Sequence, residues 1–254
     1  MSHPFLELKN VKKNYYEKEK LIKKAVNGIS LTIQSGEVLG LLGVNGAGKT
    51  TTSSIIASLI PLSSGDVLWN GESIYNVILE YRRILGFCPQ KPNLDHSLTL
   101  EQMLLFSGRY FGLSSDVIKK RKDYLIEKFD LGDYAKLKSF VLSGGYKQRF
   151  SIARTLMHSP KLVILDEPTV GLDPHVRHQL WEFIRSLKNE GITTILTTHY
   201  LDEAEVLCDR VCIIDAGEIL KIDTPDMLKA DHKHSKLEDV FLELIKNKAE
   251  TNEE

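Results

Sequence analysis

Eight residues near the N-terminus, GVNGAGKT at positions 43–50, constrain this chain more than any other segment. They follow the almost wholly apolar run Val38–Leu42, which is typical of a strand buried on both faces in the centre of a parallel sheet. A helical run follows them. Glycines at this point let successive backbone N–H groups turn inward, and the helix start adds the positive end of its dipole. The segment therefore predicts a loop that binds phosphate.

The same eight residues match the pattern G-x-x-x-x-G-K-[ST] of nucleoside triphosphate sites. In that pattern the lysine reaches the β- and γ-phosphates, and the next hydroxyl ligates a magnesium ion that bridges them. We expect Lys49 and Thr50 in these roles. The alternative is a glycine-rich turn without a ligand, but the strand before and the helix after favour nucleotide binding.

A second motif places two carboxylates, Asp166 and Glu167, directly after the apolar run Leu162–Leu165. A carboxylate at the end of a buried strand beside the phosphate loop can hold magnesium or its water. Glu167 is then a candidate general base for an attacking water. Taken alone, Asp-Glu-Pro could also merely cap and end a strand.

A third motif, LSGGYKQR at residues 142–149, opens a strongly helical segment with Ser143 as its natural N-cap. It is a second glycine-opened helix start, and such a start favours anions. A chain that already binds a triphosphate on one such helix must use this one elsewhere.

The hydrophobic pattern changes along the chain. From Phe5 to Val44, short apolar runs separated by turn signals at Asn27-Gly28 and Ser35-Gly36 predict strands and hairpins. Between Thr99 and Phe129 the period is helical, with a capping box at Thr99 and Gln102. After residue 161, strands alternate with helices, which indicates βαβ units. We predict an α/β fold: a P-loop NTPase core with a mainly parallel sheet and flanking helices, an N-terminal antiparallel β subdomain, and an inserted α-helical subdomain.

Composition excludes several classes of protein. The net charge of −1 argues against a protein that lives by non-specific nucleic-acid binding. No stretch approaches the ~18 apolar residues of a membrane span, and the N-terminus lacks the apolar character of a secretory signal. We expect any membrane association to come through a partner. Cys88, Cys208 and Cys212 have no metal-ligand spacing and are expected to be buried thiols.

Together, these motifs resemble those of the ATP-binding subunits of ABC transporters. Over about 220 residues they stand in the family's order. Residues 142–145 match its signature, 162–167 its Walker B strand and 171–173 its D-loop. Gln90 matches the Q-loop glutamine, and His199 the switch histidine. Tyr15 stands where the family places an aromatic residue against adenine, with Tyr16 as a competitor.

The resemblance implies ATP and Mg²⁺ as ligands and assigns roles to individual residues. Catalytic roles fall to Glu167 as base, His199 at the γ-phosphate, Lys49, and Gln90 as a magnesium sensor. Thr50, Gln90 and Asp166 would hold the metal. Nucleotide contacts would come from Tyr15, Gly43, Asn45, Gly46, Ala47, Gly48, Lys49, Thr50, Thr51, Ser143, Gly144, Gly145 and Asp173. The signature departs from the family at Tyr146, where glutamine is usual, which puts that side chain's contact with the nucleotide sugar in doubt.

In the family, two ATPase subunits pair head to tail with each ATP between the phosphate loop of one and the signature of the other. The partner could be the same chain or a different one. Five apolar residues of the helical lobe are more than one helix face needs, and some could receive a helix of a separate multi-span permease: Leu104, Leu105, Phe106, Tyr110 and Phe111. We expect the chain at the cytoplasmic face of the cell membrane, peripheral through that permease, with no nucleic-acid partner.

Residues 197–205 and 237–241 are similar to the bacterial branch that exports drugs, polysaccharides and lipids. A soluble ABC ATPase that acts on ribosomes or DNA is the alternative. We expect a single domain over 1–254, with the ATP-binding core and β subdomain in 1–90 and 160–230. The helical and signature subdomain would span 91–159, and a C-terminal helix and frayed tail 231–254, with the frayed end from Lys246.

Overall fold

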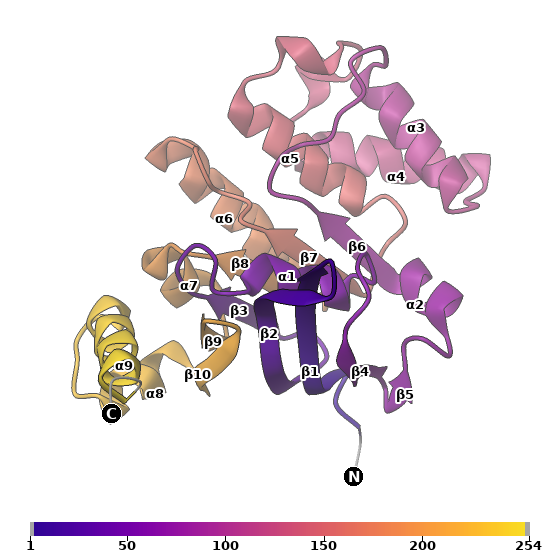
Figure 1. Ribbon diagram of the computed structural model, residues 1–254. Coiled ribbons are helices and arrows are strands. Elements are labelled where there is room, and N and C mark those ends of the chain that lie inside the picture. The colour runs from indigo at the N-terminus through magenta and orange to yellow at the C-terminus, as the bar shows by residue number, and fades with distance from the viewer. Residues whose placement is uncertain (1–2, 252–254) are drawn as a thin grey trace.

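The computed structural model describes residues 3–251 and contains two β-sheets and a separate group of helices (Figure 1). The six-stranded sheet has the order β10-β9-β3-β8-β7-β6, and only β10 pairs antiparallel. Its strands are β3 (Val38–Leu42), β6 (Leu85–Cys88), β7 (Leu162–Asp166), β8 (Thr193–Thr198), β9 (Arg210–Asp215) and β10 (Glu218–Asp223). The predicted α/β fold with a mainly parallel sheet is confirmed.

Strand β3 lies in the middle of this sheet, and all five of its residues are buried. Because strand side chains alternate between faces, its residues divide between two hydrophobic cores. Leu39 and Leu41 pack with the antiparallel sheet, whereas Val38 and Leu42 pack with the helices of the other face. Burial on both faces explains why this run is almost wholly apolar. Six residues separate the end of β3 from the start of helix α1 (Lys49–Ile56), so the phosphate-loop motif lies at the carboxyl edge of the central strand.

The antiparallel sheet has the order β2-β1-β4-β5, with β1 (Leu6–Glu17), β2 (Lys20–Ile33), β4 (Ser64–Trp69) and β5 (Glu72–Ser73). The turn between β1 and β2 falls at Lys18-Glu19, both with positive φ. The prediction that Asn27-Gly28 separates two strands is wrong: both residues lie inside β2, where the register with β1 shifts. Gly28 has φ +83°, so it bends a continuous strand. Ser35-Gly36 does separate β2 from β3.

Between β6 and β7 the chain leaves the sheet and forms the predicted helical insert, which extends beyond the β6 edge of the six-stranded sheet at the top of Figure 1. It contains α3 (Leu100–Tyr110), α4 (Ser115–Lys128), α5 (Gly144–Thr155) and the short 3₁₀ turns Gly132–Tyr134 and Ser139–Val141. Helix α3 begins with the predicted capping box, in which Thr99 and Gln102 bond to each other's backbone N–H.

The remaining helices cover the core: α2 (Ile78–Ile84), α6 (Pro174–Asn189), α7 (Leu201–Leu207), α8 (Pro225–Asp231) and α9 (Leu237–Thr251). No helix within residues 3–251 is long and apolar enough to cross a membrane. All three cysteines are buried free thiols, as predicted.

The C-terminal helix runs further than its sequence suggests. The prediction of a frayed end from Lys246 is wrong over residues 246–251, because α9 continues to Thr251. Lys248 anchors this last turn: its ammonium donates to the backbone oxygen of Asp215 at 2.9 Å and pairs with Glu218 at 3.2 Å. Residues 252–254, the rest of the predicted frayed tail, lie outside the described part of the chain.

Candidate active site

The loop between β3 and α1 packs closely against neighbouring backbone at its first and last glycines. A Cβ on Gly43 would lie 2.3 Å from the backbone oxygen of Ile214, and one on Gly48 would lie 2.5 Å from that of Ala25. Gly48 also has φ +110°, which disfavours any other residue. Ala47 accepts a 2.8 Å hydrogen bond from the N–H of Gly217. The loop is therefore held in shape from two sides before any ligand binds.

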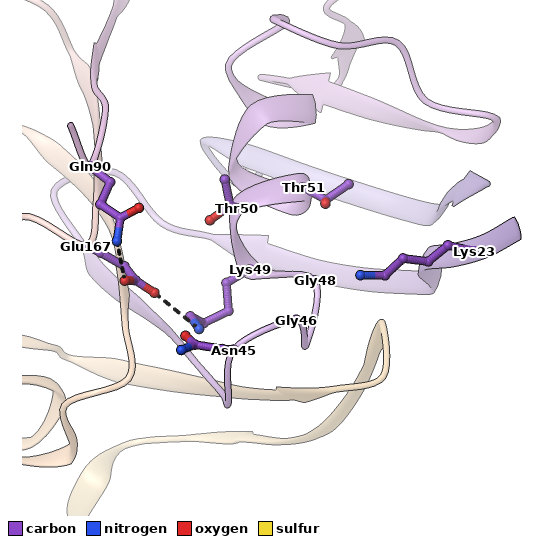
Figure 2. A pocket seen from close by; sticks show the side chains of 9 residues that line it. All are labelled: Lys23, Asn45, Gly46, Gly48, Lys49, Thr50, Thr51, Gln90 and Glu167. Atoms are coloured by element: carbon purple, nitrogen blue, oxygen red, sulfur yellow. Dashed lines mark hydrogen bonds and ion pairs between the residues drawn. The ribbon is translucent and has the colours of Figure 1, made fainter. Parts of the chain in front are cut away.

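A cavity of about 350 Å³ opens above this loop (Figure 2). Eight of the residues that line it belong to the predicted site, namely Asn45, Gly46, Gly48, Lys49, Thr50, Thr51, Gln90 and Glu167. The ninth, Lys23 of β2, is not predicted from the sequence. Gly43 and Ala47 do not line the cavity, because they form the buried base of the loop.

Glu167 contacts three other predicted site residues, each from a different segment of the chain. Its Oε1 lies 3.4 Å from the ammonium of Lys49 and 3.4 Å from Nδ1 of His199. Its Oε2 accepts a 2.9 Å hydrogen bond from Nε2 of Gln90. The residue is buried and has φ +45°, an unusual backbone conformation for glutamate. The turn after β7 thus aims this carboxylate into the cavity (Figure 2).

The neighbouring Asp166 is held by two hydroxyl groups. The Oγ1 atoms of Thr50 and Thr197 donate to its Oδ1 at 3.1 and 2.5 Å. Burial raises the pKa of Asp166 above its ordinary value, although both hydroxyls act in the opposite direction. The sequence motifs do not predict Thr197 as a site residue. Its signal is its place at the end of β8, two residues before His199 and beside the strand that carries Asp166.

This pair of oxygen ligands fits Mg²⁺. The side-chain oxygens of Thr50 and Asp166 are hard ligand atoms within hydrogen-bond distance of each other. Among residues 3–251, no positively charged side chain forms an ion pair with the buried Asp166 carboxylate. No cluster of three or more His, Cys, Asp or Glu side chains suited to a metal occurs in the described residues. Mg²⁺ needs no such cluster, because it usually binds through one or two carboxylates, water and substrate phosphates.

The predicted signature residues and Asp173 do not line this cavity. Ser143 caps α5 by accepting a hydrogen bond from the N–H of Tyr146 at 3.4 Å. Ser143, Gly144 and Asp173 are exposed, the last at the start of α6, whereas Gly145 is buried against that helix. The second glycine-opened helix start is therefore exposed at the surface and lies outside the chain's own phosphate-loop cavity.

Tyr146, which replaces the usual glutamine, is turned back into the helical lobe. Its ring centroid lies 4.3 Å from that of Tyr134, and the guanidinium of Arg149 lies 4.9 Å from the same ring. These contacts occupy the ring within its own chain. The nucleotide contact expected of the family's glutamine is thus not offered by this side chain in the observed arrangement.

Tyr15 and Tyr16 lie on opposite faces of β1, because neighbouring strand residues alternate. Tyr15 pairs directly with Lys23 across the strands, and directly paired residues share a face. Lys23 lines the cavity, so Tyr15 stands on the cavity side and Tyr16 on the other. Neither tyrosine lines the cavity itself, and both are exposed.

The family model for the ABC transporter matches residues 26–170. Nod factor export ATP-binding protein I of Rhizobium sp. (strain N33) is 40% identical over 241 residues, which are 95% of this chain and 78% of that protein. The linearmycin resistance ATP-binding protein LnrL of Bacillus subtilis (strain 168) is 42% identical over 219 residues, 86% of this chain and 69% of that protein.

Solved structures agree with these sequence matches. An ATP-binding subunit of an ABC transporter superposes with a TM-score of 0.83 at 30% identity, covering 95% of this chain and 99% of the other. A dimeric ATP-binding cassette in a post-hydrolysis state with ADP and Pi gives 0.76 at 28% identity, covering 86% and 98%. Since the family model covers more than half of the chain and the relatives nearly all of it, the chain belongs to the ABC transporter family and is an ATP-binding subunit that hydrolyses ATP.

Proposed function

We propose that ATP binds in the 350 Å³ cavity with its triphosphate on the loop and with Glu167 as the general base for the attacking water. One observation carries this proposal: Glu167 contacts Lys49, Gln90 and His199, which come from three other segments. A lone carboxylate at a strand end would need none of these neighbours. Here its oxygens are already oriented by groups that suit a phosphate-hydrolysing site.

Each neighbour has a distinct task in this proposal. Lys49 places a positive charge where negative charge develops on the γ-phosphate. His199 holds the γ-phosphate and the departing product. Glu167 takes the proton of the water, and the amide N–H of Gln90 holds that carboxylate in place while its amide oxygen is left for a metal. Magnesium bound by Thr50, Asp166 and Gln90 would supply charge neutralisation at the phosphate oxygens.

The exposed signature supports a head-to-tail pair of subunits. Ser143 and Gly144 are exposed at the start of α5, where backbone N–H groups and the helix dipole favour an anion. We propose that they meet the γ-phosphate held by a second ATPase subunit, with Asp173 at the same interface. A dimeric cassette among the similar structures supports this arrangement. The second subunit can be a copy of this chain or a different ATPase chain.

The helical lobe carries an apolar groove that suits a permease. Of the five predicted docking residues, Leu104 is buried in the core and Phe111 stacks on His158 with centroids 3.7 Å apart. Phe106 and Tyr110 are 49% and 85% exposed. Together with Leu98 and Met103 they form the apolar part of a hollow of about 420 Å³, whose polar lining is Asp95, Ser107 and Arg154. We propose that it receives a helix from a multi-span membrane subunit, which would hold this chain at the cytoplasmic face of the membrane.

Export is the direction of transport that the relatives favour. Nod factor export and linearmycin resistance stand in the names of proteins about 40% identical to this chain. A subunit from Clostridium perfringens with a TM-score of 0.80, 29% identical over 91% of this chain and 92% of its own, is part of the transporter complex CbiONQ, which supports assembly with other subunits but not a direction of transport. We propose that this chain powers export of a drug, lipid or polysaccharide through its permease.

Isolation of the tagged chain from detergent-solubilised membranes tests this proposal. A multi-span protein should co-purify with the wild type and be lost from Phe106→Glu or Tyr110→Glu, because a charge in the groove opposes apolar docking. Leu242→Glu, a similarly exposed apolar residue on α9, is the matched control and should keep the partner. Recovery of ribosomes or DNA without a membrane protein would support the soluble alternative.

A further inference from the structure

Lys23 lines the cavity but has no role in the site described above. It comes from β2 of the antiparallel sheet, and its side chain extends toward Gly48 and the start of α1 (Figure 2). Within residues 3–251 its ammonium makes no hydrogen bond or ion pair with any side chain or backbone group. Lys49, the other lysine of the cavity, is saturated by contacts inside the protein.

The cavity has two ends, and Lys23 marks the one opposite the catalytic carboxylate. Gln90 and Glu167 stand at one side in Figure 2, Lys49 lies between, and Lys23 stands at the other side. A triphosphate with its γ-phosphate near Glu167 therefore runs along the loop toward Lys23. The phosphate that reaches Lys23 is the one attached to the sugar.

The pairing of β1 with β2 places the adenine base at the same end of the cavity as Lys23, opposite the γ-phosphate. Tyr15, the residue proposed to stack on adenine, pairs directly with Lys23 on the same face of the sheet. The sugar and α-phosphate must lie between the stacked base and the loop. The Lys23 ammonium is placed in that interval, where a flexible cation can approach a phosphate oxygen.

We propose that Lys23 is a nucleotide-binding residue whose ammonium contacts the α-phosphate of ATP. The inference rests on the proposed position of the triphosphate in the cavity. It assigns the residue to binding, because the bond that breaks during hydrolysis is at the far end of the triphosphate. A lysine at this place would contribute equally to the affinity for ATP and for ADP, since both carry the α-phosphate.

Competition against a fluorescent ATP analogue, with ATP, ADP and adenosine as competitors, tests this assignment. Lys23→Ala should weaken ATP and ADP by the same factor, about tenfold for a hydrogen bond to a charged group on the open side of a site. Adenosine, which has no phosphate, should bind Lys23→Ala and wild type equally. Lys23→Arg should recover most of the affinity.

Lys24→Ala is the matched control, because it removes the same charge from the next residue of β2, whose side chain points to the other face. It should leave all three affinities unchanged. Equal affinity of Lys23→Ala and wild type for ATP and ADP would overturn the assignment, as would a loss that extends to adenosine. Retained ATP affinity in Lys49→Ala would instead contradict the proposed nucleotide site, so the two failures are distinguishable.

Discussion

The ammonium of Lys49 lies 3.4 Å from Oε1 of Glu167, and both side chains are buried. The same ammonium donates to the backbone oxygens of Gly43 and Val44 at 2.8 and 3.2 Å. A lysine has three protons to donate, so these three acceptors saturate it. In this arrangement the lysine and the proposed base hold each other, and an incoming phosphate must replace at least one of these acceptors.

Glu167→Gln should bind ATP and retain almost no turnover. The amide keeps the size of the side chain and leaves Lys49 free of a competing negative charge, so ATP affinity should be equal or higher. It cannot accept the water's proton at neutral pH, and loss of a general base costs roughly 10²–10⁴ in rate. ATPase assays and gel filtration in ATP measure both effects, and we expect an accumulated dimer. Normal hydrolysis by this variant would remove Glu167 from the base role.

Tyr15→Ala should weaken ATP binding about tenfold or more, because stacking of a base on an aromatic ring is worth roughly 1–3 kcal/mol. Tyr16→Ala should leave affinity unchanged, because Tyr16 faces the other side of β1. One face of the Tyr15 ring already holds the Lys13 ammonium, 5.3 Å from its centroid, and the other face can take adenine. Titration calorimetry of both variants measures the difference. A larger loss in Tyr16→Ala would reverse the assignment.

Local features of the chain were predictable from sequence. The phosphate loop, the two carboxylates at the end of β7 and the capping box of α3 each depend on residues within one short segment. The turn predicted at Asn27-Gly28 is wrong, because a bulge inside a strand and a turn between strands use the same residue types. The positions of Lys23 and Thr197 depend on which strands are neighbours and in which register. Hydrophobic periodicity does not specify register across two sheets, so neither residue was found.

Binding of Mg²⁺ with ATP should weaken with acidification, starting nearer to neutral pH than for an ordinary carboxyl group. Burial raises the pKa of Asp166, and the metal requires its ionised form. The affinity lost should follow one proton taken up by this group. Isothermal titrations at a series of pH values, with Mg²⁺ and ATP, measure it. An affinity that does not fall on acidification would contradict Asp166 as the metal-binding carboxylate.

The same pKa makes a prediction for stability without nucleotide. The folded pKa of Asp166 lies above the unfolded value, so the ionised buried carboxylate costs stability at neutral pH, and this cost disappears as pH falls through the raised pKa. Asp166→Asn should therefore raise Tm at pH 7. The advantage over wild type should shrink in acid. Thermal unfolding at both pH values checks it, and a lower Tm at pH 7 would contradict the argument.

Replacing the two signature glycines by alanine should have different effects: Gly145→Ala should lower stability, whereas Gly144→Ala should prevent dimerisation. A Cβ on Gly145 would lie 2.5 Å from Cγ1 of Val176, so α5 and α6 must separate in Gly145→Ala. Such overpacking costs roughly 1–3 kcal/mol. Val176→Ala removes the clashing methyl groups, so the double variant should regain part of the Tm lost by Gly145→Ala. Independent, additive effects of the two substitutions would contradict this packing account.

Gly144→Ala should keep or slightly raise Tm while losing ATP-dependent dimerisation. The nearest atom to a Cβ on Gly144 is Cδ2 of Leu172, at an ordinary contact distance of 3.9 Å, and alanine favours a helix over glycine. The added methyl group would, however, stand on the exposed face that we propose meets the second subunit's phosphate. The test places Gly144→Ala in the Glu167→Gln background and follows dimer formation by gel filtration in ATP. Because folding is intact in this variant, a lost dimer reports on the interface, and an unchanged dimer would mean that Gly144 lies outside it.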